Sequence, residues 1–177
     1  MKKKHNIHII RYVIYLLEIL FFSAVSSAPN LIPDIMGRKP NLMVALLCGI
    51  VLFEGGQPSA VFGIICGFLI DINTGVFLGF HTSLLCFLSY FVGTFSKYYL
   101  QKNMISFFIV STVFLALFSH VQFFVLYILQ KYSHVYYAYL SRCIPATLYT
   151  WVFSQLFYIL NSVFTFKLRD AKHFNCN

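Results

Sequence analysis

The side chains that could carry acid–base or metal chemistry are few and scattered along the chain. Enzymes place paired acid–base groups or sets of metal ligands together, and the sequence holds no HExxH, P-loop or GxSxG motif and no CxxC spacing. His81 and His120 lie in different apolar runs, and no spacing places a carboxylate beside either ring, so we expect hydrogen-bonded packing residues. The sequence therefore predicts no enzyme, no catalytic residue, no metal and no cofactor. The acids are Glu18, Asp34, Glu54, Asp71 and Asp170.

Glu18 and Asp71 stand out among the acids because both lie in apolar runs, where a carboxylate is costly unless it is paired or hydrated. Arg11 lies about 10 Å before Glu18 along the same helix face, too far for a firm ion pair. Glu18 either faces a polar cavity or a partner's basic group, or is protonated or hydrogen-bonded within the chain. Asp71 either caps the next helix, together with Asn73 and Thr74, or organises a partner.

A ladder of small residues runs through the same region. Because residues four apart share a helix face, it predicts a ridge on which two helix backbones pack closely. Such a ridge serves packing within one chain and association of two copies equally, so a homo-oligomer stays open. The ladder consists of Gly63, Gly67, Asp71, Gly75 and Gly79.

A second stripe, of polar residues, lies in the last apolar run. Its steps of three and four residues form one helical face, which predicts contact with protein rather than lipid. The pattern leaves open whether that protein is this chain or another. The stripe consists of Thr147, Thr150, Ser154, Tyr158, Asn161 and Thr165.

The elements that must position these residues are membrane helices. The chain has 177 residues, of which 59% are apolar and 10% are charged, against about 25% charged in a soluble domain. This composition excludes a soluble globular protein and a disordered chain. Since a span needs about 20 residues, the length fits one integral membrane domain over 1–177, an all-α bundle of about six transmembrane helices, with five as the alternative count.

The apolar runs predict helices over 9–28, 41–53, 59–72, 76–95, 104–129 and 144–166. We expect Pro40 and Asn41 to open the second helix and Glu54 to Pro58 to form a tight turn. The helices over 41–53 and 59–72 would each rise only about 20 Å. They are therefore expected to be half-spans, or to have neighbouring loops that protein covers.

The net charge of +8 points to membrane topology rather than to nucleic acid, because the basic residues cluster at the ends of apolar runs. With six spans and both termini in the cytoplasm, the cytoplasmic side has eight basic residues and the outer side has four. The cytoplasmic set is Lys2, Lys3, Lys4, Lys97, Lys102, Lys167, Arg169 and Lys172; the outer set is Arg38, Lys39, Lys131 and Arg142.

Residues 38–93 resemble the MreD family, the membrane component of the bacterial rod-shape complex. The resemblance rests on Arg38-Lys39-Pro40-Asn41-Leu42, on the glycine-bearing helix that ends in Asp71, and on Leu78-Gly79 at the start of the next helix. The family usually has Arg directly before the proline, where this chain has Lys39. The overall length and the very hydrophobic body with short tails match as well.

This resemblance implies a non-catalytic scaffold in the bacterial cytoplasmic membrane. The scaffold would bind MreC, a single-span protein with a periplasmic domain, and through it help link MreB filaments to the peptidoglycan synthases. We expect the two short helices and the Asp71 ridge to shape a groove for a partner helix or juxtamembrane segment. The candidates for partner binding or helix packing are Lys39, Pro40, Asn41, Gly63, Gly67, Asp71, Gly75, Gly79 and Glu18.

The alternative function belongs to another class. Small six-helix bundles also resemble the substrate-binding S components of energy-coupling-factor vitamin transporters. Ala24 and Ala28 form a small-xxx-small pair like the one that such proteins use to dock their coupling subunit. A vitamin site would need a cavity near the outer face, to which residues 132–139 and Trp151 could contribute aromatic groups.

Overall fold

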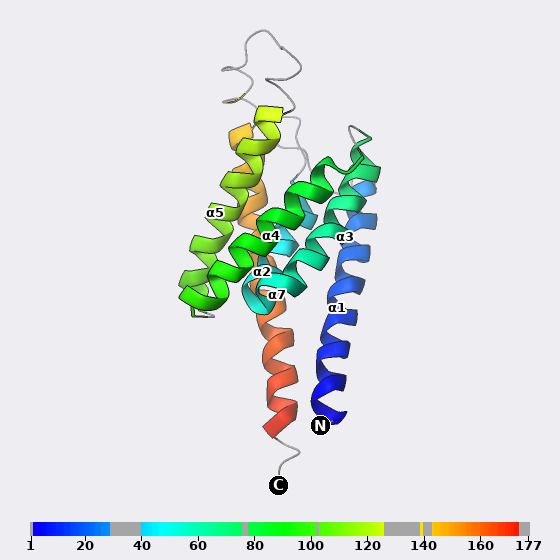
Figure 1. Cartoon of the computed structure of the whole chain (residues 1–177), viewed down its shortest axis with the longest axis vertical. Coiled ribbons are helices and arrows are strands. Elements are labelled where there is room, and N and C mark those ends of the chain that lie inside the picture. Colours follow the sequence, from blue (N-terminus) through cyan, green and yellow to red (C-terminus); the bar gives the residue numbers. More distant parts are fainter. Residues whose placement is uncertain are drawn as a thin grey trace.

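A computed structural model describes residues 2–28, 40–75, 78–101, 103–125, 139 and 143–173, with side chains described between residues 9 and 162, residue 160 excepted. In these ranges the chain is all-helical (Figure 1), as the sequence predicted. The helices are α1 (Lys2–Ser27), α2 (Leu42–Glu54), α3 (Gly56–Thr74), α4 (Phe80–Tyr99), α5 (Met104–Phe123) and α7 (Ile144–His173).

Helix α2 agrees with its predicted range to within one residue, but its start and end differ from expectation. Asn41 is the N-cap, so Pro40 precedes the helix instead of opening it. Only Gly55 separates α2 from α3, where we expected a turn from Glu54 to Pro58. Gly55 makes this one-residue reversal because its φ of +76° suits a residue without a side chain. Pro58 lies in the first turn of α3, where backbone N–H groups have no partner within the helix.

Helices α3 and α4 correct two further expectations. Helix α3 has 19 residues, which is about 28 Å, so it is not a half-span. Helix α4 begins at Phe80 and not at residue 76, and it continues to Tyr99. The other ranges begin or end differently too: α1 starts at Lys2, α7 reaches His173, and α5 ends at Phe123, while the predicted residues 126–129 lie outside the described part.

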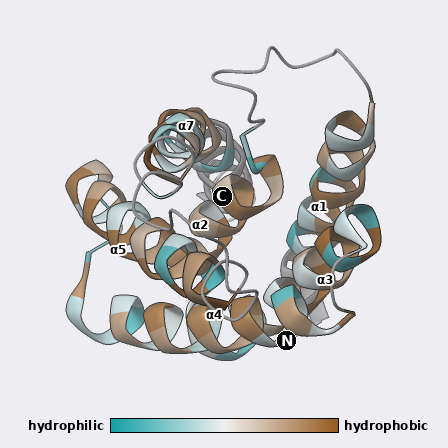
Figure 2. Ribbon diagram, turned by 90° about the horizontal axis from the view of Figure 1, so that it is seen from above, coloured by the Kyte–Doolittle hydropathy of each residue, from teal (hydrophilic) through white to brown (hydrophobic). Residues whose placement is uncertain are grey.

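Helix α2 forms the centre of the bundle (Figure 2). It contacts α1, α3, α4, α5 and α7, and every residue from Leu42 to Phe53 is buried. A helix that is apolar all round has no face for water and is therefore buried on every side. With 13 residues it is about 20 Å long. The short length expected for this helix is confirmed, and the structure adds that the helix itself is covered by protein on every side.

The outer helices expose apolar side chains. Leu17 on α1, Phe87 on α4 and Leu148 on α7 are each at least 59% exposed. Within the described residues, three helical segments are long and apolar enough to cross a membrane: Ile9–Ser27, Gly56–Thr74 and Met104–Phe123. The chain is therefore a helical membrane bundle, while the count of six spans stays a prediction. Helix α1 begins and α7 ends at the same end of the bundle (Figure 1).

Candidate functional site

Asp71 organises the turn between α3 and α4. It lies near the end of α3 with no exposed surface, and its carboxylate accepts backbone N–H bonds from the start of α4. The distances are 2.9 Å from Gly79 N, 3.0 Å from His81 N and 3.1 Å from Thr82 N. The Thr82 hydroxyl donates to the same carboxylate at 2.7 Å. Asp71 thus satisfies the N–H groups that begin α4, and the capping role weighed from the sequence is the one that the geometry shows.

The other residues of the turn do not have the roles expected for them. Asn73 accepts a hydrogen bond from Ser27 on α1 at 3.0 Å, and the Thr74 hydroxyl donates to the Ile70 carbonyl, so neither caps α4. Gly75 ends α3 in a left-handed conformation, and Gly79 is the left-handed N-cap of α4. The four-residue ladder therefore forms one helix face only as far as Asp71. Gly75 and Gly79 serve the turn and not the ridge.

His81 extends this polar cluster to a third helix. The Nδ1 atom of His81 lies 2.8 Å from Asp71 Oδ1, and its Nε2 atom lies 3.3 Å from Nε2 of Gln122 on α5. The ring is 1% exposed. A ring that donates from Nδ1 to Asp71 and accepts the Gln122 amide at Nε2 is consistent with both distances. The sequence missed the Asp71–His81 contact because a turn, and not helical spacing, brings the two residues together.

Gly63 and Gly67 place the backbone of α3 directly against α4. A Cβ atom at Gly63 would lie 2.7 Å from the Leu85 carbonyl oxygen, and one at Gly67 would lie 2.7 Å from the His81 carbonyl oxygen. The face that we expected to form a groove for a partner helix is thus covered by α4 of the same chain. This expectation was wrong in its geometry, because the small residues that would admit a partner admit α4 instead.

Arg11 and Glu18 on α1 have different surroundings. Arg11 forms a two-point ion pair with Glu54 at the end of α2, at 2.6 Å from Nε to Oε1 and 2.8 Å from Nη2 to Oε2. Glu18 lies two turns further along α1. Its Oε2 atom is buried and has no hydrogen-bond partner among the described residues. The ion-pair partner of Arg11 is therefore Glu54, which sequence spacing could not reveal.

The segment before α2 is fixed to α7. Pro40 is buried, and the Asn41 N–H donates to the Thr150 hydroxyl at 3.1 Å, while Lys39 lies outside the described residues. Thr150, Ser154 and Asn161 are each at most 5% exposed, so this part of the polar stripe on α7 packs inside the chain. Neither amide atom of Asn161 has a hydrogen-bond partner among the described residues.

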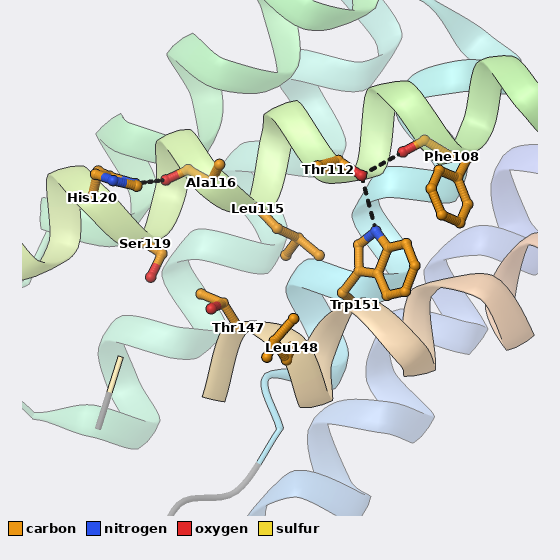
Figure 3. Close-up of a pocket in the computed structure, with 9 residues that line it drawn as sticks. All are labelled: Phe108, Thr112, Leu115, Ala116, Ser119, His120, Thr147, Leu148 and Trp151. Carbon is orange, nitrogen blue, oxygen red and sulfur yellow. Dashed lines mark hydrogen bonds between the residues drawn. The ribbon is translucent and has the colours of Figure 1, made fainter. Parts of the chain in front are cut away.

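A cavity of about 350 Å³ lies between α5 and α7 (Figure 3). Asp71 and His81 do not line it, and the described residues contain no group of three or more His, Cys, Asp or Glu side chains that could hold a metal ion. The lining residues are Phe108, Thr112, Leu115, Ala116, Ser119, His120, Thr147, Leu148 and Trp151.

A comparison with protein families matches residues 6–168 to the family described as rod shape-determining protein MreD. This match extends the resemblance from residues 38–93 to nearly the whole chain. Neither the curated proteins nor the solved structures include a match.

Proposed function

The chain belongs to the MreD family of rod shape-determining proteins, and from this premise we propose that it is a non-catalytic scaffold of the bacterial elongation complex. In this proposal it sits in the cytoplasmic membrane, binds an MreC-like single-span protein, and through that partner helps couple MreB filaments to the peptidoglycan synthases. The family match carries the rod-shape role. The contacts of the described residues suggest where the partner binds.

The exposed face of α1 is our candidate for the partner's transmembrane helix. Helix α1 packs on α2 and α3 through Tyr15 and Ile19, while Leu17 and Phe21 on its other side are 59% and 62% exposed. Glu18 lies between these two faces, with one carboxylate oxygen buried and without a partner among the described residues. A carboxylate in an apolar span is costly, so a donor on a partner helix that reaches the part-exposed Glu18 side chain would relieve a cost that the described residues leave uncompensated.

The state of Asp71 supports the non-catalytic part of the proposal. A carboxylate has about four lone-pair sites, and Asp71 receives five hydrogen bonds from this chain. Its oxygens are thus committed to holding α4 and His81. A general base needs an oxygen within reach of the substrate proton, and Asp71 offers none.

The arrangement of the helix ends supports the proposed orientation. Helix α1 begins, and α7 ends, at one end of the bundle, and basic residues are expected on the cytoplasmic side. Lys97 lies in the last turn of α4, and α5 begins a few residues later at Met104. We propose that this end faces the cytoplasm, with both termini on that side.

The test is co-purification of the tagged full chain from native membranes in mild detergent, with mass spectrometry of proteins and small molecules. We expect recovery of a single-span protein with a periplasmic domain, and a loss of at least tenfold in its recovery for Glu18→Leu. Glu18→Gln keeps hydrogen bonding and is expected to lose less. Phe87→Leu, on the exposed face of α4, is the control and should recover the partner as the wild type does.

Two results would contradict the proposal. Equal recovery of the partner with Glu18→Leu and with Phe87→Leu would remove α1 as its docking face. Recovery of ATPase and coupling subunits, or of a stoichiometric vitamin, in place of a single-span partner would make the chain a transporter S component. The mass of the intact complex in the same preparation also gives the number of copies of this chain.

A further inference from the structure

The cavity between α5 and α7 is a groove that runs along α5 and is bordered on α7 by Thr147, Leu148 and Trp151. Its lining on α5 extends from Phe108 to His120, which is about 18 Å of helix. One leaflet of the hydrocarbon core is about 15 Å thick, and α5 is one of the three helices that can span a membrane. The groove is therefore slightly longer than one leaflet is thick and, if α5 spans the membrane, extends from near the end of α5 past the bilayer midplane.

The groove is too narrow to enclose a whole helix. A volume of about 350 Å³ along about 18 Å gives a mean cross-section of about 20 Å². An α-helix with side chains is about 10 Å wide, which is about 80 Å². Carbon atoms of neighbouring groups touch at about 4 Å, so a single hydrocarbon chain needs a channel about 4 to 5 Å wide. The groove matches this width.

The apolar end of the groove leaves no polar group in need of a ligand. Leu115 forms the floor and is 3% exposed, while Phe108 and Trp151 meet edge to face. The Trp151 indole N–H donates to the Thr112 hydroxyl at 3.0 Å, and that hydroxyl donates to the Phe108 carbonyl at 2.7 Å. A ligand here gains apolar contact only.

The opposite end of the groove is polar. Ser119, His120 and Thr147 lie together there, and Figure 3 shows their polar atoms at the end away from Phe108 and Trp151. The Tyr139 hydroxyl lies 3.0 Å from His120 Nε2, and His120 Nδ1 lies 2.7 Å from the Ala116 carbonyl. Because His120 is near the end of α5, this polar end lies at the level expected for lipid headgroups.

We infer that the groove holds one acyl chain of a membrane phospholipid. The headgroup end of the acyl chain lies near Ser119 and His120, and its terminal methyl end lies toward Phe108 and Trp151. The length, the width, the apolar floor and the polar end each match that ligand. The inference uses only the groove and the membrane setting, so it stands or falls independently of the proposed scaffold role.

Trp151 provides the test because it is the only tryptophan in the chain. The full-length protein is placed in phosphatidylcholine vesicles whose acyl chains carry bromine atoms, which quench indole fluorescence on contact. We expect strong quenching, stronger with bromine in the lower half of the acyl chain than in the upper half. Ala116→Phe fills the groove, and it should reduce this quenching at least twofold.

Leu117→Phe is the matched control, because it adds a ring at the next position of α5, outside the groove lining. It should leave the quenching unchanged. Ser119→Leu, at the polar end, is a second variant in case Ala116→Phe does not fold, and it should shift the depth at which bromine quenches best. Helical content by circular dichroism and a monodisperse elution profile establish that each variant is folded.

Two outcomes would overturn the inference. If Ala116→Phe and Leu117→Phe show the same quenching as wild type, Trp151 contacts only the surrounding bilayer and the groove holds no chain. The second outcome uses a co-purified protein partner. If adding this partner lowers the quenching of the wild type, and Ala116→Phe then lowers it no further, a protein segment occupies the groove in place of lipid.

Discussion

The two helix pairs α3–α4 and α5–α7 differ in how closely their backbones approach. Between α3 and α4, Gly63 and Gly67 let the backbones touch so closely that not even a methyl group fits. Between α5 and α7, Phe108 and Trp151 hold the helices apart and leave a cavity of about 350 Å³. Lipid tails are as apolar as leucine, so helix association in a membrane depends on packing and polar contacts. Residue size therefore decides which pair is closed and which is open.

The polar contacts between the helices also differ, and those of the α3–α4 pair are less exposed. In the closed pair, Asp71 joins α3 to the first turn of α4 through one buried and two part-buried bonds. In the open pair, the Trp151–Thr112 bond lies at an exposed edge. We expect the closed pair to determine whether the bundle folds. The open pair is expected to determine what the bundle binds.

The largest effect is expected from Gly67→Leu. A side chain at this position would meet backbone atoms of His81 and Thr82, which cannot move aside as a flexible side chain would. Overpacking of this kind typically costs about 1–3 kcal/mol and occasionally more. We expect the variant to insert into the membrane but to lose most of its thermal stability and its recovery of a partner protein. Membrane extraction followed by thermal unfolding in detergent measures both effects.

The control for this variant is Ile64→Leu, on the lipid-facing side of α3, which should unfold like the wild type. Equal unfolding temperatures for Gly67→Leu and Ile64→Leu would show that the close approach of α3 and α4 contributes nothing.

A smaller but clear loss is expected from Asp71→Ala. The change removes a helix cap, worth about 0.5–2 kcal/mol, and leaves the buried His81 N–H without an acceptor, at about 1–3 kcal/mol. We expect a destabilisation of about 3 kcal/mol, with faster hydrogen exchange at Gly79, His81 and Thr82 because their N–H groups lose the acceptor. Exchange measured by mass spectrometry reports this directly.

The stability and the hydrogen-exchange rate of Asp71→Asn should lie between those of the wild type and Asp71→Ala. One oxygen remains as an acceptor, while the new amide NH₂ group faces donors. Exchange that stays as slow in Asp71→Ala as in the wild type would contradict the capping role.

The smallest effect on stability is expected in the open pair. Ala116→Leu adds apolar atoms to a cavity, so no backbone must move, and we expect a change of less than about 1 kcal/mol in either direction. Thermal unfolding of Ala116→Leu and Gly67→Leu in parallel compares the two helix pairs directly, since both changes replace a small residue by leucine. A loss as large as that of Gly67→Leu would mean that the α5–α7 groove is closed in the folded protein.

Much of the fold could be read from the sequence because its signals are local. The apolar runs predicted helices, and the apolar segment 41–53 predicted a short helix, as α2 is. The spacing of Gly63 and Gly67 predicted a close approach of two backbones, because residues four apart share a helix face. The motif around Asp71 also pointed to the family that the match over residues 6–168 shows.

The helix boundaries were less accurate where a single residue redirects the chain. Gly55 alone reverses the chain between α2 and α3, and Gly79 delays the start of α4. A glycine with positive φ ends one helix or begins the next, but its letter in the sequence does not distinguish this use from a place on a packing ridge. Gly75 and Gly79 were therefore assigned to the ridge by a spacing that the turn reproduces by coincidence.

The sequence by itself determined that this chain is an apolar helical bundle, which residues share each helix face, and to which family it belongs. Only the tertiary structure decided which faces meet: Asp71 with His81, Arg11 with Glu54, and the glycine face of α3 with α4 rather than with a partner. The physical reason is that helical periodicity fixes the side chains around one axis. The pairing and separation of two axes depend instead on the volumes and hydrogen bonds of both helices at once.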